Sequence, residues 1–156
     1  IVEFLKMRPE YTAVLFGGGK DLLEKLVKDV PKDVADRIKL LGYVEREKIT
    51  AILSSAKIFL APSRWESFGI AAGESLCMGC SVAATPVESL QYLAMQGFSG
   101  SVAPNFTKNG FLSALIEDAI KWDHDQYRPE EIAAFWRPKL DRKVVARSIQ
   151  DIVEKS

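Results

Sequence analysis

Histidine and cysteine are scarce in this chain of 156 residues, which contains one histidine and two cysteines. A tetrahedral zinc site usually takes four ligands, most of them of these two types, so the sequence offers too few for an obvious site. The cysteines, Cys77 and Cys80, form a C-x-x-C pair around Gly79 at the expected end of a helix. Because the helix dipole disfavours a thiolate there, we expect buried structural cysteines and neither a redox pair nor a metal site.

Net charge and long apolar runs are lacking as well. The chain has 21 basic and 21 acidic residues, so nothing global indicates nucleic acid or an anionic membrane as a partner. No apolar run approaches the roughly 18 to 20 residues that span a bilayer. The start of the chain lacks the basic, apolar and small-residue order of a signal peptide. We therefore expect a cytoplasmic location.

The residues that are present suit one globular domain. The sequence is 47% hydrophobic and 27% charged, which is ordinary for a chain with a buried core. We expect this domain to span 1–156, with its core over about 1–122 and a helical tail over about 123–156. The opening residues IVEFL have the spacing of the last turns of an amphipathic helix, so we expect a piece of a longer protein.

Short apolar runs alternate with helical patterns along most of the chain. The runs YTAVLF, IKLLG, KIFLA, SVAAT and SGSV predict strands, and segments with apolar residues at helical spacing lie between them. This alternation predicts βαβ units and hence a doubly wound, Rossmann-like α/β fold with a parallel sheet covered on both faces. Extra helices are expected over 107–121 and within 129–154, with no strand between them.

Two glutamates, Glu66 and Glu74, stand eight positions apart in the segment WESFGIAAGES. The segment lies between an expected strand and an expected helix over 69–78, and such loops meet at the ligand-binding edge of a parallel sheet. The first amides of that helix, near Phe68 to Ala71, are unsatisfied within the helix and lie at the positive end of its dipole. A phosphate or diphosphate is the natural ligand of such a helix terminus.

The glutamates add a second kind of recognition. Glu74 lies inside the expected helix among apolar residues, where an unpartnered carboxylate would be costly. A carboxylate can accept hydrogen bonds from two hydroxyl groups, so each glutamate suits a sugar diol on one side of a diphosphate. This layout fits a nucleotide sugar. The small residues between them either admit a ligand close to the backbone or let the helix pack tightly; they are Gly69, Ala71, Ala72 and Gly73.

The segment PSRWESFGIAAGESLCMGCSVAAT resembles the Glu-x7-Glu segment of retaining glycosyltransferases of the GT-B fold, in particular those of group 4 (GT4). The likeness extends through VLFGGGKDLLEKL and IKLLGYVEREKITAILSSAKIFLAPS and covers roughly the first 105 residues in order. The resemblance implies the C-terminal, donor-binding domain of an enzyme that transfers a hexose from a nucleotide-diphosphate sugar to a glycan or lipid acceptor. It implies no metal and no cofactor, and we expect the chain alone to bind its donor without turnover.

The resemblance also implies roles for individual residues. Glu66 would contact hydroxyl groups of the donor sugar as the catalytic residue, and Glu74 would contact the ribose hydroxyls. Other residues implied in donor binding are Phe68, Gly69, Ile70 and Ala71 at the diphosphate, Gly42, Tyr43 and Val44 against the base, and Gly17, Gly18 and Gly19 at the floor of the crevice.

The implied partners are a UDP-, GDP- or ADP-linked sugar and an N-terminal acceptor-binding domain of the same protein. Any contact with the inner membrane would run through that second domain, and no nucleic acid is expected.

Two alternative functions stay open on the same architecture. A sugar-nucleotide epimerase would need its own acid and base, for which the sequence suggests no set. The second alternative is a non-catalytic, flavodoxin-like binding module. A receiver domain of that type would need an aspartate at the end of a central strand, and the strand ends in VLFGGG and FLAPS have none.

Overall fold

The computed structural model describes residues 1–18, 20–95 and 97–140. These residues group into two compact units, one over Ile1–Ala51 and the other from Ile52 onward. Each unit is described by itself below. The expected single domain over 1–156 stays a prediction.

The first unit is built on two parallel strands, β1 and β2, with Ala13 opposite Ile38 and Phe16 opposite Gly42. The guanidinium group of Arg37 donates hydrogen bonds to the carbonyl oxygens of Leu5, at 2.8 Å, and Tyr11, at 3.1 Å, so it ties the first helix to the start of β2. The elements are α1 (Val2–Met7), β1 (Ala13–Phe16), α2 (Lys20–Val27), α3 (Lys32–Ala35) and β2 (Ile38–Gly42).

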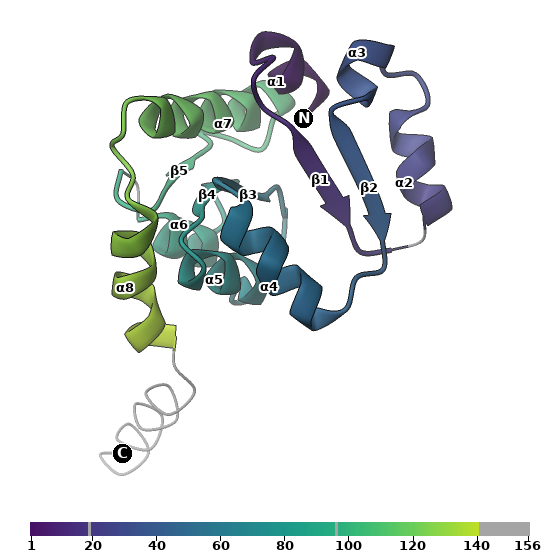
Figure 1. Cartoon of the computed structure of the whole chain (residues 1–156). Coiled ribbons are helices and arrows are strands. Elements are labelled where there is room, and N and C mark those ends of the chain that lie inside the picture. The colour runs from purple at the N-terminus through teal and green to yellow at the C-terminus, as the bar shows by residue number, and fades with distance from the viewer. Residues whose placement is uncertain (19, 96, 141–156) are drawn as a thin grey trace, which may run out of the picture. The chain divides into compact units, whose positions relative to one another are not determined.

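The second unit contains a three-stranded parallel sheet in the order β3-β4-β5. Helix α7 lies along one face of this sheet, and α5 and α6 lie along the other (Figure 1). Helix α8 packs on α5. The elements are α4 (Arg46–Ser55), which begins in the first unit, β3 (Ile58–Ala61), α5 (Ile70–Cys77), β4 (Ser81–Ala84), α6 (Glu88–Ala94), β5 (Gly100–Val102), α7 (Lys108–Asp123) and α8 (Pro129–Leu140).

Local sequence explains where these elements begin and why the sheet is buried. Thr107 caps α7, since its side-chain oxygen accepts a hydrogen bond from the Gly110 amide at 3.0 Å. Pro129 opens α8, a position at which the missing amide hydrogen costs nothing. All four residues of β4 are buried, as expected of a central strand covered on both faces. Trp122 and Trp136 of the C-terminal helices are core residues, so these helices pack against the sheet domain.

The expected alternation of parallel strands and helices is confirmed, and the five strand segments occur close to their predicted positions. Pairing within the described residues gives a two-stranded sheet in the first unit and a three-stranded sheet in the second. The short helix α3 was not predicted, because four residues carry too little periodicity to detect. The expected helical tail over 129–154 is confirmed as far as Leu140; its remainder lies outside the described residues.

A buried polar cluster joins α7 to the sheet at the start of β4. Asp118 is fully buried, and its carboxylate accepts hydrogen bonds from the hydroxyl groups of Ser81 and of Ser101, at 3.2 Å for the latter, and from Tyr127 at 2.7 Å. The indole of Trp122 donates to the Ser81 oxygen at 2.8 Å. Burial raises the pKa of Asp118 above its ordinary value, and the three hydroxyl donors oppose that shift. Sequence analysis did not identify this cluster.

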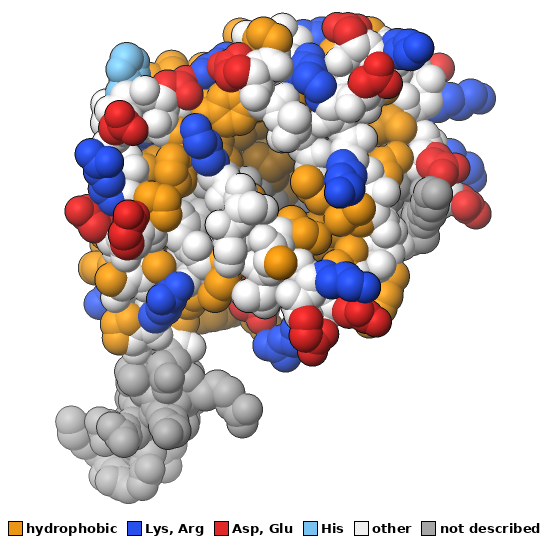
Figure 2. All heavy atoms as spheres, viewed as in Figure 1, with side chains coloured by type: hydrophobic (Ala, Val, Ile, Leu, Met, Phe, Trp, Pro, Cys, Tyr) orange, Lys and Arg blue, Asp and Glu red, His pale blue; other side chains and the backbone are white. Residues whose placement is uncertain are grey.

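The surface carries charges of both signs. Basic and acidic side chains are interspersed over the visible face of the described residues, in keeping with the balanced composition (Figure 2). Among the helices that the structure describes, none is both long enough and apolar enough to cross a bilayer.

Candidate functional site

The loop over residues 62–69 connects β3 to α5 at the carboxyl edge of the three-stranded sheet. Gly69 closes the loop as the N-cap of α5, with φ +81° and ψ 50° in the left-handed region. A Cβ atom added at Gly69 would lie 3.0 Å from Leu90 Cδ2 and 3.1 Å from Leu93 Cδ1. The start of α5 is therefore packed tightly against α6. Glycine suits this position because it adopts positive φ readily and because there is little space for a Cβ atom.

The N-terminus of α5 is exposed. No side chain among the described residues caps it, and its first turn contains no acidic residue. Phe68 is 48% exposed and Ile70 is 69% exposed, while Ala71 is also classed as exposed. The amides of this turn therefore lie at a surface that an anion can reach, at the positive end of the helix dipole.

Both predicted glutamates belong to this part of the molecule. Glu66 lies in the loop and Glu74 on the second turn of α5, and both are exposed. The expectation that Glu74 lies in an apolar environment is wrong. Helix α5 turns Ala72 and Leu76 into the core, so position 74 falls on the opposite, solvent-facing side of a helix with 3.6 residues per turn.

The small residues of α5 divide between the two uses that the sequence left open. Gly73 is buried, and a Cβ atom there would lie 3.1 Å from Leu140 Cδ1 of α8, so Gly73 permits close helix packing. Ala72 is buried as well. Gly69 is also buried, against α6. Of these four small residues only Ala71 is exposed, so the surface that a ligand can reach is limited to the first turn of the helix.

Two side chains beyond β4 hold the loop in place. Thr85 donates a hydrogen bond from its hydroxyl to the carbonyl oxygen of Ser63, and Ser89 donates to the carbonyl oxygen of Glu66 at 3.2 Å. Sequence analysis missed both residues. The signal was available, because the loop after β4 must lie beside the loop after β3 at the carboxyl edge of a parallel sheet.

The remaining predicted residues lie in the first unit, also at the carboxyl ends of parallel strands. Gly17 donates its amide hydrogen to the Gly42 carbonyl oxygen at 2.7 Å, which brings the ends of β1 and β2 together. Gly17, Gly18 and Gly42 all have positive φ, which explains glycine at these turns. Tyr43 is 85% exposed and Val44 is half-buried. Gly19 lies outside the described residues.

Comparison with known proteins identifies the family. The model of the glycosyl transferases group 1 family matches residues 2–118. The chain belongs to the glycosyl transferases group 1 family. Its fold is that of the C-terminal portion of GT-B glycosyltransferases, which confirms the resemblance seen in the sequence. In those enzymes this portion is the donor-binding domain.

Individual relatives of this glycosyltransferase domain are distant and longer. An uncharacterized glycosyltransferase of Methanocaldococcus jannaschii is 28% identical over 108 residues, which are 69% of this chain and 30% of the relative. An uncharacterized 41.2 kDa protein in the cps region of Klebsiella pneumoniae is 32% identical over 127 residues, or 80% of this chain and 34% of that protein. The chain thus spans about a third of the length of these relatives.

A solved structure shows the same fold. The Anabaena protein HepE, determined in complex with UDP and glucose, superimposes with a TM-score of 0.75 at 18% identity. The match covers 99% of this chain and 44% of the HepE chain.

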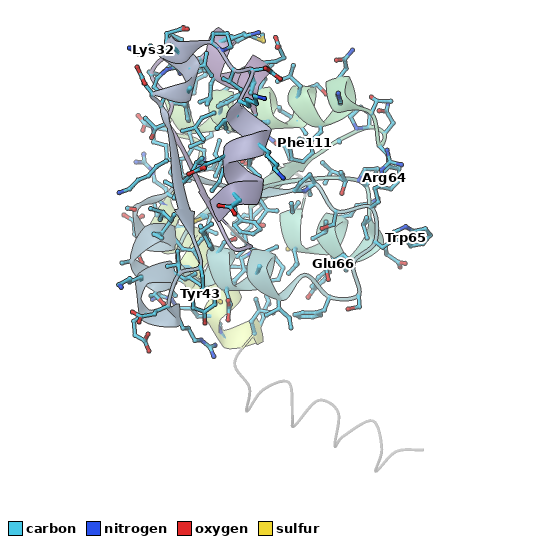
Figure 3. The ribbon with its side chains drawn as sticks, turned by 90° about the vertical axis from the view of Figure 1, so that its right-hand side faces the viewer. Lys32, Tyr43, Arg64, Trp65, Glu66 and Phe111 are labelled. Atoms are coloured by element: carbon cyan, nitrogen blue, oxygen red, sulfur yellow. The ribbon has the colours of Figure 1, made fainter. Side chains whose placement is uncertain are left out.

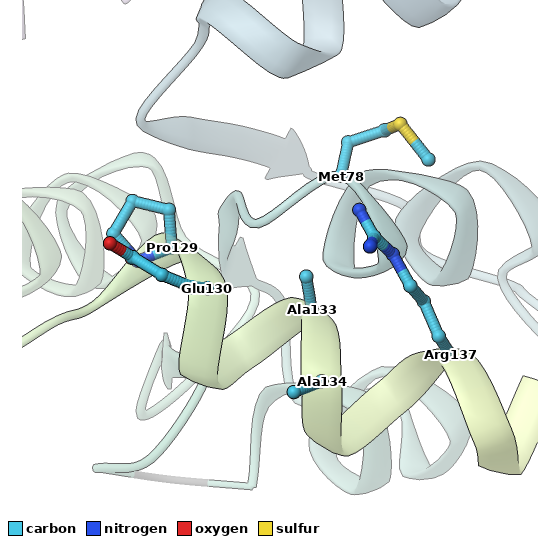
Figure 4. A pocket seen from close by; sticks show the side chains of 6 residues that line it. All are labelled: Met78, Pro129, Glu130, Ala133, Ala134 and Arg137. Carbon is cyan, nitrogen blue, oxygen red and sulfur yellow. The ribbon is translucent and has the colours of Figure 1, made fainter.

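The opposite end of α5 carries a separate pocket in the glycosyltransferase domain. It has a volume of about 370 Å³ and is lined by Met78, Pro129, Glu130, Ala133, Ala134 and Arg137 (Figure 4). Arg137 donates a hydrogen bond from Nε to the Cys77 carbonyl oxygen at 2.8 Å, so it satisfies the C-terminal end of α5. None of the predicted site residues lines this pocket.

The cysteines beside this pocket behave as structural residues. Cys80 is buried, and its thiol donates to the Leu53 carbonyl oxygen at 3.1 Å. Burial raises the pKa of Cys80 to about 11 and also raises the pKa of the half-buried Cys77. Both thiols therefore stay protonated near neutral pH. Cys80 is buried as expected, whereas Cys77 is only half-buried.

Removing the hydroxyl group of Ser89 should loosen the loop. In Ser89→Ala the Glu66 carbonyl oxygen loses its 3.2 Å partner, and one such hydrogen bond contributes about 0.5 to 1.5 kcal/mol. We expect the amides of residues 64–68 to exchange with deuterium about two- to tenfold faster. Ser113→Ala is the matched control, because the Ser113 hydroxyl bonds only locally, to the Gly110 carbonyl oxygen at 2.8 Å. Equal exchange in this loop for both variants would contradict the role of Ser89.

Proposed function

We propose that this domain binds the nucleotide-diphosphate sugar of a retaining hexosyltransferase. The whole protein would transfer the hexose to a glycan or lipid acceptor held by another part of its chain. The observation that carries the proposal is the exposed N-terminus of α5, which no described side chain caps, with Glu66 just before it and Glu74 just inside it.

The helix terminus would hold the diphosphate. The amides from Phe68 to Ala71 can donate to its oxygens, and the positive end of the helix dipole favours its negative charge. The same groups would serve the reaction, since the leaving nucleoside diphosphate gains charge as the bond to the hexose breaks. Donors that already face this developing charge lower the barrier without reorganising during the step.

The two carboxylates would bind the sugars on either side. In this proposal Glu66 accepts hydrogen bonds from hydroxyl groups of the hexose, and Glu74 accepts them from the ribose. Both side chains are exposed, so hydroxyl groups of a ligand can reach their carboxylate oxygens. Tyr43 and Val44 would lie against the base, and Gly17 to Gly19 would line the floor of the crevice. UDP is one candidate nucleotide, in view of the ligand in the HepE structure.

Nucleotide binding is tested by titrating the chain with UDP, GDP and ADP while amide chemical shifts are followed. We expect shifts at Phe68, Gly69, Ile70 and Ala71 with at least one of the three. If the chemical shifts of these amides do not change at millimolar concentrations of any of the three nucleotides, the proposed donor site is overturned.

Charge-neutral variants should separate the two glutamates. Glu74→Gln should weaken binding of both the nucleoside diphosphate and its sugar conjugate about tenfold, which corresponds to about 1.4 kcal/mol and to the loss of one charge-assisted hydrogen bond. Glu66→Gln should weaken only the conjugate, by a similar factor. Calorimetric titration of each variant with UDP and UDP-glucose, or with the GDP or ADP pair that binds best, measures both effects.

Glu117→Gln is the control for this pair, because Glu117 is an exposed carboxylate on α7. It should leave both affinities unchanged. Equal losses for nucleotide and nucleotide sugar in Glu66→Gln would contradict the hexose assignment, and an unchanged nucleotide affinity in Glu74→Gln would contradict the ribose assignment.

A further inference from the structure

Trp65 is 93% exposed, although it lies directly before Glu66 in the loop between β3 and α5. The other two tryptophans of the chain are buried, Trp122 at 8% and Trp136 at 0% exposure. Figure 3 shows Trp65 projecting outward at the edge of the molecule, on the same side as Arg64 and Glu66. Phe68 and Ile70 of the same short segment are exposed as well, so this is a local concentration of apolar surface.

The loop presents Trp65 on a fixed backbone. The hydroxyl of Thr85 bonds the Ser63 carbonyl oxygen on one side of Trp65, and the hydroxyl of Ser89 bonds the Glu66 carbonyl oxygen on the other. Gly69 then closes the loop against α6. A side chain on such a backbone loses little conformational freedom on binding, and the indole itself has only two rotatable bonds.

We propose that Trp65 is a carbohydrate-stacking residue, whose indole face receives a pyranose ring of the substrate beside Glu66. The inference rests on the proposed function. A pyranose offers an apolar face of C–H groups and a rim of hydroxyl groups, so it needs an aromatic surface and a hydrogen-bond acceptor together. Trp65 and Glu66 supply these from adjacent positions. The ring belongs either to the donor hexose or to the sugar unit that accepts it.

Tryptophan fluorescence isolates this residue, because a small neutral quencher such as acrylamide reaches exposed Trp65 far more readily than the two buried tryptophans. Quenching is measured for the chain alone, with UDP, GDP or ADP, with the matching glucose or mannose conjugates, and with methyl glucoside, methyl mannoside or methyl galactoside. The methyl glycosides are added with and without the nucleotide.

Protection by a nucleotide sugar beyond that by its nucleotide assigns the stacked ring to the donor. Protection by a methyl glycoside assigns it to the acceptor. If neither class of sugar protects Trp65, the stacking role is overturned. The nucleotide titration of amide shifts is independent of this result, so nucleotide binding without sugar protection would remove the role of Trp65 alone. If no nucleotide binds, the proposed donor site is overturned. Protection of Trp65 from quenching by the methyl glycosides then decides whether Trp65 stacks on a sugar.

Variants supply a second readout. Trp65→Ala should reduce affinity for the protecting sugar about three- to tenfold while leaving nucleotide affinity unchanged, and Trp65→Phe should recover part of the loss. Tyr92→Ala is the matched control, since Tyr92 is also an exposed aromatic side chain, at 60%, but lies on α6. Wild-type sugar affinity in Trp65→Ala would overturn the proposal.

Discussion

Replacing Asp118 with alanine should lower the free energy of unfolding of the second unit by about 3 to 5 kcal/mol. The carboxylate is fully buried and accepts hydrogen bonds from Ser81, Ser101 and Tyr127. Without it, three hydroxyl donors from two strands and the loop before α8 lose their common acceptor in the interior. A buried donor left unsatisfied costs about 1 to 3 kcal/mol, and partial rearrangement of the two serines keeps the total below the simple sum.

Urea unfolding followed by circular dichroism measures this loss. Glu117→Ala is the matched control on the same helix. Its ion pair with Lys121, at 2.6 Å, is partly exposed, with Glu117 48% exposed, so we expect a change of at most about 0.5 kcal/mol. A loss in Asp118→Ala no larger than that of the control would show that the cluster does not stabilise the fold.

The pH dependence of stability provides an independent check on Asp118. Burial raises the pKa of Asp118 in the folded state above its ordinary value of 3.8, so folding favours the protonated carboxyl. Its contribution is fully present below the unfolded pKa and is lost as pH rises through the higher folded pKa. The stability of wild type minus that of Asp118→Asn should therefore fall as pH rises across this window. A difference that grows with pH would mean that the hydrogen bonds outweigh burial.

Gly69→Ala should destabilise the second unit by about 1 to 3 kcal/mol and weaken nucleotide binding. Alanine costs about 1 to 2 kcal/mol in the left-handed conformation with φ +81°, and its Cβ would crowd Leu90 and Leu93 at 3.0 and 3.1 Å. Relief of that crowding moves the start of α5, whose amides are the proposed diphosphate donors. Thermal unfolding and nucleotide titration measure the two effects.

Gly97→Ala separates the cost of the left-handed backbone conformation from the effect of crowding against Leu90 and Leu93. Gly97 also has positive φ, at +95°, but a Cβ atom there would meet nothing within 4 Å. It should show the conformational cost without any loss of nucleotide binding. Equal binding losses in both variants would contradict the view that Gly69 acts through the position of the helix terminus.

Most of the secondary structure could be predicted from sequence because it is local. Runs such as KIFLA and SVAAT alternate with helical spacing, and parallel strands separated by helices follow from that order. The position of the candidate site could be proposed from the sequence for the same reason, because the segment around Glu66 lies between a predicted strand and a predicted helix. The exposure of Glu74 could not be predicted, because either face of a helix can turn toward the core or toward solvent. The neighbouring elements decide which face is buried.

Residues close together in the chain were enough to predict the family, the order of strands and helices, and the presence of two glutamates beside a helix N-terminus, because each of these is a local pattern. Only the tertiary structure showed that Glu74 is exposed, that Gly73 packs against Leu140, and that Thr85 and Ser89 hold the loop that presents Trp65. The cluster around Asp118 likewise joins residues that are far apart in the chain, such as Ser81 and Trp122, which are 41 positions apart. Such contacts are set by the packing of helices on the sheet, which no local pattern encodes.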